Sequence, residues 1–300
     1  MTAVALVHHR EERHKLAHLA PVDAQAKLIS MWLYGKASST QGIYKDYITR
    51  FLAFVAKPLP SVTLEDLYDF AVYLDQQELA KSSQKTMLYA VKSLLTFAYK
   101  LGMIPINVGV ALTLGKTPDT LNSRLLSESE VTQLIWNGEP NPRNRAILRL
   151  LYGAGLRVSE LCALKWKDLT PRGDSGQVTV MGKGEKVRSV LLPKSIWDEL
   201  VQMRGNALDN EPVFCSRKGK GKGHLNRKTI NKIIAAATQR AGLTQKISPH
   251  YLRHAHASHA LERGANVGLV KETLGHSNVS VTSRYLHARP NESSAMYLPL

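Results

Sequence analysis

His250 and Arg253 are spaced to bind one small anion between them. Positions three residues apart share a face of an α-helix, so the imidazole and the guanidinium can reach the same ligand. Ser248 and Pro249 come directly before them and mark the start of a helix, where unpaired backbone N–H groups also favour an anion. This pattern predicts an anion site.

A metal site is the alternative interpretation of the same segment. His250 and His254 have the i,i+4 spacing of metal ligands on a helix, and His256 and His259 follow. However, no carboxylate lies among them, there is no His-Glu-x-x-His sequence, and the surroundings are cationic. We therefore expect no metal here.

Arg157 and Lys183 are two further candidates, each following or lying among glycines. Arg157 comes after Tyr152–Leu156, and a Gly-rich turn before a helix can hold an arginine beside a phosphate. Lys183 lies between Gly182 and Gly184 at the tip of a predicted hairpin, where an arm could reach the minor groove or protonate a leaving group. A surface arginine and an exposed turn lysine are the simpler interpretations, and a Walker A motif is absent.

Tyr285 comes nine residues after His276, which belongs to Leu274–Ser277. A single tyrosine near a helix is usually a half-buried core residue whose hydroxyl is hydrogen-bonded. Taken alone, this tyrosine gives no reason for a chemical role.

The charge of the chain favours a polyanionic partner. Its formal net charge is +16, with 13 Lys and Arg against 9 Asp and Glu in residues 1–118 and 27 against 15 in residues 119–300. Between Glu211 and Glu262 there is no carboxylate but there are ten Lys and Arg. A solvated basic face is the alternative, but a stretch of this length favours a DNA-facing surface.

The elements that must position these residues are mainly helical. Two strands are expected at 177–181 and 186–192, and Ser, Thr and Pro residues mark helix starts. The predicted caps are Ser38, Ser39 or Thr40, then Thr63 with Asp66, then Ser82 or Ser83, and Ser127. Later helices are predicted at 194–204, 227–241, 249–263 and 266–275.

Two domains joined by a linker account for this pattern. A flexible extension (1–20) is expected before a small helical domain (21–112), and residues 113–124 have the turn-rich composition of a linker. The second domain (125–290) is expected to be mostly α with the small sheet, and 291–300 forms a tail.

Compartment and class follow from what the chain lacks. Cys162 and Cys215 form no CxxC pair and suit a reducing cytoplasm. Ala3–Val7 is too short for a signal sequence, and no segment approaches the ~18 apolar residues of a membrane span. We expect a soluble, cytoplasmic protein with no membrane contact.

Read together, five segments resemble the tyrosine recombinase, or phage integrase, family, with the closest likeness to Xer-type bacterial recombinases. In order they are Gly-Leu-Arg-Val-Ser-Glu-Leu (155–161), Gly-Lys-Gly (182–184), Ser-Pro-His-Tyr-Leu-Arg-His-Ala (248–255), Leu-Gly-His-Ser (274–277) and Ser-Arg-Tyr-Leu-His (283–287). Their order and spacing fit throughout 125–290, whereas the first helical domain matches more vaguely. Residues 1–20 and those after Arg289 are not covered.

The resemblance implies a fold and an activity. The fold would be an N-terminal helical, SAM-like core-binding domain followed by a mostly α catalytic domain with a small antiparallel sheet, the DNA breaking-rejoining fold. The activity would be site-specific recombination, with strands cut and rejoined through a 3′-phosphotyrosyl intermediate and a Holliday junction. No metal, ATP or nucleotide cofactor is implied, because the covalent link conserves the energy of the phosphodiester.

The resemblance also assigns roles to the motif residues. Tyr285 would be the nucleophile, and Arg157 and Arg253 would hold the nonbridging oxygens of the scissile phosphate. Lys183 would protonate the leaving 5′-oxygen, and His250 would help to take the tyrosine proton. The two remaining roles are a hydrogen bond to the phosphate from His276 and orientation of basic side chains by Glu160.

Double-stranded recombination sites are the partner that the family implies. Four protomers, of this chain or of this chain with a related recombinase, would bind two sites, and residues 291–300 would dock into a neighbour or remain frayed. The predicted phosphate contacts are Arg217, Lys218, Lys220, Lys222, Arg227, Lys228, Lys45, Lys81 and Lys85.

Two other functions remain open on the sequence. A type IB topoisomerase uses a similar set of residues but relaxes supercoils without exchanging partners, and a catalytically idle accessory protein would only bind DNA. The motif wording and the two-domain layout favour recombination.

Overall fold

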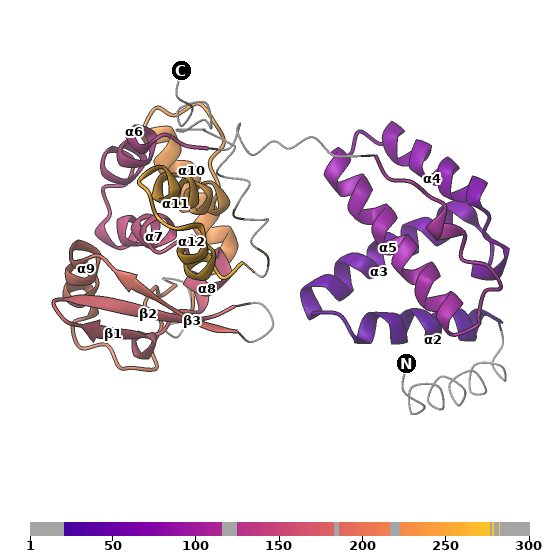
Figure 1. Ribbon diagram of the computed structural model, residues 1–300, viewed down its shortest axis with the longest axis horizontal. Coiled ribbons are helices and arrows are strands. Elements are labelled where there is room, and N and C mark those ends of the chain that lie inside the picture. Colours follow the sequence, from indigo (N-terminus) through magenta and orange to yellow (C-terminus); the bar gives the residue numbers. More distant parts are fainter. Residues whose placement is uncertain are drawn as a thin grey trace, which may run out of the picture. The chain divides into compact units, whose positions relative to one another are not determined.

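The computed structural model describes residues 21–115, 125–182, 186–216, 223–276, 278 and 282. The chain divides into two compact units, unit 1 (1–118) and unit 2 (119–300), shown in Figure 1. The fold is mainly α with one small antiparallel sheet, as predicted.

Unit 1 is a bundle of helices arranged around its longest member. In its described part these are α2 (Pro21–Tyr34), α3 (Ser38–Val55), α4 (Leu64–Gln76) and α5 (Lys81–Lys100). The first three all pack against α5, which buries Leu94 and Leu95 completely. The bundle therefore has one continuous apolar core.

In unit 1 the predicted cap of α4 is confirmed, whereas the predicted caps of α3 and α5 are not. The Thr63 capping box is confirmed, because Thr63 Oγ1 accepts from the Asp66 N–H at 3.3 Å and the Asp66 carboxylate accepts from the Thr63 N–H at 2.7 Å. The serine caps of α3 and α5 are wrong, since the N-cap residues are Ala37 and Ala80. Instead, a glutamine inside each first turn donates back to the carbonyl of the residue before the N-cap, Gln41 to Lys36 at 2.8 Å and Gln84 to Leu79 at 2.9 Å.

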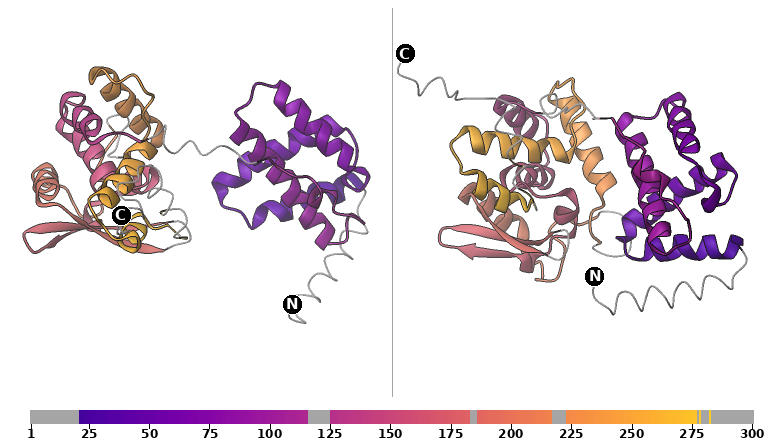
Figure 2. Two further views of the ribbon diagram at one scale, coloured as in Figure 1. Left: turned by 45° about the horizontal axis from the view of Figure 1, so that its top comes forward. Right: turned by 45° about the vertical axis from the view of Figure 1, so that its right-hand side comes forward.

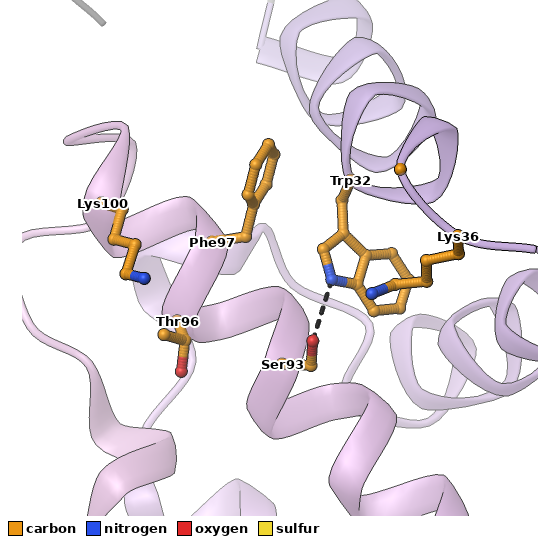
Figure 3. Close-up of a pocket in the computed structure, with 7 residues that line it drawn as sticks. Trp32, Lys36, Ser93, Thr96, Phe97 and Lys100 are labelled. Atoms are coloured by element: carbon orange, nitrogen blue, oxygen red, sulfur yellow. Dashed lines mark hydrogen bonds between the residues drawn. The ribbon is translucent and has the colours of Figure 1, made fainter. Parts of the chain in front are cut away.

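A hollow on unit 1 lies between α2 and α5 (Figure 3). The Trp32 indole N–H donates to Ser93 Oγ at 3.1 Å, and the Lys36 ammonium lies 4.7 Å from the Trp32 ring centroid. Trp32 thus joins the two helices by a hydrogen bond as well as by packing.

Unit 2 places its helices around a second apolar core. Its elements are α6 (Glu128–Thr132), a π-helical turn (Gln133–Asn137), α7 (Pro142–Gly153), α8 (Val158–Ala163), β1 (Leu169–Arg172), β2 (Ser175–Met181), β3 (Val187–Leu192), α9 (Lys194–Arg204), α10 (Arg227–Arg240), α11 (Pro249–Glu262) and α12 (Val267–Leu274). The Ser127 cap is confirmed, and Glu130 completes it as a capping box. The four later helices lie within one residue of their predicted bounds.

The sheet has the order β1-β2-β3 (Figure 1) and is antiparallel throughout. Figure 2 shows the same sheet from two further directions. Val178 and Val190 face each other across β2 and β3 and are buried, and β2 packs against α9. At Gly176 a Cβ would lie 2.0 Å from Trp197, so only glycine allows α9 to approach this closely. β1 was not predicted, because only Leu169 of its four residues is buried.

Candidate functional site

Helix α11 carries His250 in its first turn and Arg253 three residues later on the same face. Pro249 occupies the first helical position and Ser248 is the N-cap residue, as the sequence indicated. His250 is open to solvent, whereas Arg253, one turn later, is 6% exposed. The helix therefore presents the imidazole at the surface and holds the guanidinium beneath it.

Arg253 ties two distant segments to α11. One terminal nitrogen donates to the carbonyl oxygen of Gly155, and the other donates to that of Leu274. Gly155 has a φ of +57°, and a Cβ there would lie 2.6 Å from a methyl group of Leu274. The turn before Arg157 thus needs glycine for both its conformation and its packing.

Arg157 is the N-cap residue of α8, and it is anchored on two sides. Its backbone N–H donates to Glu160 Oε2 at 2.7 Å, and its Nη1 donates to Glu160 Oε1 at 2.8 Å. Its Nη2 donates to the carbonyl oxygen of Gly275 at 2.8 Å. The side chain keeps 27% of its surface exposed, so it can still meet a ligand from solvent.

Glu160 is the anion that fixes this cluster of arginines. Its side chain is 3% exposed and bonds both Arg157 and Arg188. Burial by itself would raise the pKa of Glu160, but the hydrogen bonds from Arg188 and Arg157 outweigh it, so the pKa lies below its usual range. The carboxylate is therefore charged and orients two guanidinium groups. Arg188 was not among the residues predicted from the sequence.

His276 follows the C-terminal end of α12 and lies in the field of the same arginines. Its Nδ1 is 2.9 Å from Thr282 Oγ1. Burial, and then the positive charges of Arg253 and Arg157, lower the pKa of His276 to about 4. The ring is neutral at neutral pH and keeps one N–H as a donor.

His250 responds to the same field. Partial loss of water, followed by the charges of Arg253, Arg157 and Arg227, lowers its pKa. A neutral imidazole can accept a proton, so His250 has the form that a general base requires. The two histidines and two arginines predicted from three separate motifs are thus brought together.

Three aromatic residues that the sequence did not assign to this site hold the turn before Arg157. His256 donates from Nδ1 to the carbonyl oxygen of Tyr152 at 2.7 Å. His259 lies 2.9 Å from the carbonyl oxygen of Leu126 through Nε2 and 3.0 Å from the Tyr152 hydroxyl through Nδ1. Burial raises the pKa of Tyr152. The sequence signal for these residues is the histidine spacing on α11, which also fits a metal motif.

Several predicted residues lie outside the described residues, and others lie on the surface. Outside are Lys183, Tyr285, Arg217, Lys218, Lys220 and Lys222. Arg227 and Lys228 at the start of α10, and Lys45 on α3, are exposed. Lys81 pairs with Asp75 at 2.7 Å, and Lys85 donates to the Gly115 carbonyl at 2.8 Å.

Two further properties concern the described part of the chain only. No group of three or more His, Cys, Asp and Glu side chains there is arranged to hold a metal ion. No helix there is both long and apolar enough to cross a membrane. The hollow beside Trp32 contains none of the predicted catalytic residues (Figure 3).

Comparison with known proteins gives consistent matches for both units. The family model described as the phage integrase family matches residues 124–292, and that of the phage integrase N-terminal SAM-like domain matches residues 27–100. A tyrosine recombinase of Thermosipho africanus is 33% identical over 267 residues, covering 85% of this chain and 91% of the relative. Tyrosine recombinase XerD of Vibrio cholerae is 32% identical over 276 residues, covering 87% and 89%.

A solved structure shows the same fold. The crystal structure of a lambda integrase dimer bound to a COC′ core site matches with a TM-score of 0.70 and 19% identity, covering 89% of this chain and 97% of that one. At this identity the likeness concerns the fold alone.

Proposed function

We propose how this chain, which belongs to the phage integrase family and is a site-specific tyrosine recombinase, breaks and rejoins DNA. Tyr285 attacks the scissile phosphate, and Arg157, Arg253, His250, His276 and Lys183 assist. The observation that carries the proposal is the convergence of the two arginines and two histidines, which come from separate motifs, on one positively charged place.

The two arginines bind the nonbridging oxygens of the phosphate. A guanidinium carries five N–H donors, so it can hold a carbonyl or carboxylate oxygen and still donate to a ligand. Because Arg157 is fixed by Glu160 and Gly275, and Arg253 by Gly155 and Leu274, the donors are oriented before DNA arrives. Preorganised donors stabilise the charge that develops in the pentavalent transition state.

The chemical step balances without a cofactor. The Tyr285 oxygen forms a bond to phosphorus while the bond from phosphorus to the 5′-oxygen breaks. The tyrosine proton passes to neutral His250, and Lys183 supplies a proton to the leaving 5′-oxygen. His276 donates a hydrogen bond to the phosphate. The product is a 3′-phosphotyrosyl link, which a 5′-hydroxyl of the partner strand can attack in the reverse sense to rejoin the DNA.

The proposed partner is a pair of double-stranded recombination sites. A tetramer of protomers binds them, and the DNA strands exchange through a Holliday junction. The exposed Arg227, Lys228 and Lys45 can reach phosphates directly. Lys81 is paired with Asp75, but both side chains are exposed, so exchanging this pair for a phosphate costs little. In this proposed tetramer, residues 291–300 of each protomer dock onto a neighbouring protomer.

The test begins by recovering covalent protein–DNA adducts from cells that express the chain, which identifies the target site. A nicked duplex carrying that site then traps the cut strand, because the released fragment diffuses away. Wild type is expected to give an SDS-stable adduct, Tyr285→Phe to give none, and Tyr99→Phe, an exposed tyrosine of unit 1, to match wild type. An undiminished adduct in Tyr285→Phe would falsify the assignment.

A second measurement addresses the metal independence of the reaction. Cleavage of the same nicked duplex in excess EDTA is expected to equal cleavage without it. Loss of cleavage that a divalent ion restores would contradict the proposal.

A further inference from the structure

Arg188, the second residue of β3, joins that strand to two other segments of unit 2. Its terminal nitrogens donate to both oxygens of the Glu160 carboxylate, at 2.7 and 2.8 Å, and its Nε–H donates to the Thr273 carbonyl oxygen at 2.8 Å. The side chain is 11% exposed. The planar guanidinium therefore connects β3 to α8 and to the end of α12 through three directed bonds.

The same guanidinium lies beside two glycines that each precede a motif residue. A Cβ on Gly275 would lie 3.3 Å from Arg188 Nη1, and a Cβ on Gly182 would lie 3.7 Å from the same atom. Gly275 comes directly before His276, and Gly182 directly before Lys183. Arg188 thus bonds Glu160, the partner of Arg157, and lies beside the glycines that precede His276 and Lys183.

The hairpin can transmit the position of Arg188 toward its tip. Backbone pairing continues from Val180 opposite Arg188 to Met181 opposite Val187, and the Gly182 N–H donates to the Lys186 carbonyl at 2.8 Å. Backbone pairing therefore links Arg188 to Gly182 and Lys186, the two residues that flank 183–185. Lysine could not replace this anchor, because its single ammonium lacks the fork that grips the carboxylate and the carbonyl together.

We propose that Arg188 is a positioning residue for proton delivery to the leaving 5′-oxygen. It holds the β3 side of the hairpin against Glu160 and Thr273, and proton transfer from Lys183 depends on that anchor. This inference rests on the proposed function, in which Lys183 is the general acid. Arg188 itself bonds the carboxylate and carbonyl and acts through Lys183.

A substrate whose leaving group needs no proton separates this function from a merely structural one. In a duplex with sulfur in place of the bridging 5′-oxygen, a thiolate leaves, and thiols have pKa values near 8.5, far below those of alcohols. Arg188→Gln is expected to slow cleavage of the oxygen substrate by about 10²-fold, a typical loss for a misplaced general acid. On the sulfur substrate its rate should approach that of wild type, as should the rate of Lys183→Ala.

Arg240→Gln is the matched control. Arg240 also donates from Nε to a backbone carbonyl, that of Gly138 at 2.6 Å, and from a terminal nitrogen to a buried carboxylate, Glu139 at 2.8 Å. The Arg240→Gln variant is expected to lose about as much thermal stability as Arg188→Gln. Its ratio of cleavage rates on the sulfur and oxygen substrates should stay at the wild-type value. Arg188→Lys, which retains the charge, provides a second variant with the Arg188→Gln pattern if the glutamine variant does not fold.

The outcomes distinguish the inference from the function on which it rests. Suppose that sulfur rescues Lys183→Ala. If the Arg188 variants are then slowed equally on the oxygen and sulfur substrates, or are slowed on neither substrate, the inference is wrong and the proposed function stands. If sulfur fails to rescue Lys183→Ala, the assignment of Lys183 as the general acid is wrong, and the inference is overturned with it.

Discussion

Unit 1 and unit 2 differ in the polar and charged side chains that they bury. Among the described residues, the buried polar or charged side chain of unit 1 is Gln84. Those of unit 2 are Glu139, Glu160, Thr238, Arg253, Ser258, His259 and Thr282. Both units also have a large apolar core, so the difference lies in what is buried beside the core rather than in its size.

The difference shows what each unit is built to do. An apolar bundle gains stability from burial and tolerates changes on its surface, which suits a unit that presents a face to a partner. Burying charge costs free energy unless every group is paired, so unit 2 uses part of its stability to hold guanidinium and imidazole groups in place. The pairing of Glu160 with two arginines is the clearest case.

The largest expected effect comes from removing the anion at the centre of unit 2. Glu160→Ala leaves Arg157 and Arg188 without their carboxylate and should lower the free energy of unfolding by about 3–5 kcal/mol, with loss of DNA cleavage. Chemical denaturation measures the first and the nicked-duplex assay the second. Asp198→Ala, which breaks the exposed pair with Lys194, is the control and should change neither. A Glu160 variant as stable as wild type would contradict the contrast between the units.

A smaller effect is expected at the buried polar residue of unit 1. Gln84 donates to the carbonyl oxygens of Leu74 and Leu79, so Gln84→Ala should lower the free energy of unfolding by about 1–3 kcal/mol. The cleavage rate of DNA-saturated enzyme should stay at the wild-type value, because no catalytic residue depends on this contact. A loss of that rate at saturation would show that the two units are coupled more closely than the contrast implies.

Acid should weaken unit 2 before unit 1. The pKa values of His250, His256 and His276 are lowered in the folded protein, that of His276 to about 4, whereas the described part of unit 1 has no histidine. As pH falls through about 6.5, the unfolded chain takes up protons that the folded unit does not, so stability present above that pH is lost progressively toward pH 4.

Tryptophan fluorescence can follow this acid effect in unit 2 alone. In Trp32→Phe the remaining tryptophans, Trp136, Trp166 and Trp197, all belong to unit 2, so its thermal midpoint should fall between pH 6.5 and 4.5. Adding His276→Gln should make that fall shallower. An unchanged slope in the double variant would contradict the link to His276.

The smallest effects should be equal in the two units. Thr63→Ala removes the cap of α4 and Ser127→Ala that of α6, and each should cost about 1 kcal/mol. Calorimetry of the two variants measures these losses. Glu130, the partner of Ser127 in this cap, also accepts a hydrogen bond from Gln245 at 3.0 Å. A much larger loss of unfolding free energy for Ser127→Ala would therefore indicate that α6 helps to hold the polar groups of unit 2.

Local features were predicted well because their causes are local. The two capping boxes lie within four consecutive residues, and the later helices end where periodicity stops, so the sequence sufficed for both. The starts of α3 and α5 were predicted one to three residues late, because glutamines inside the helices, rather than serines, bond the preceding chain. β1 was missed because its pairing with β2, not its own composition, makes it a strand.

By itself the sequence determined which residue types are present and in what order, and this was enough to indicate the family, the two arginines and the histidines. Only the tertiary structure decided which groups hold them. Arg188 reaches Glu160 across 28 positions, and Arg157 reaches Gly275 across 118. Such contacts leave no periodicity or short-range spacing in the chain, because they are selected by how β3, α8 and α12 pack after each has formed.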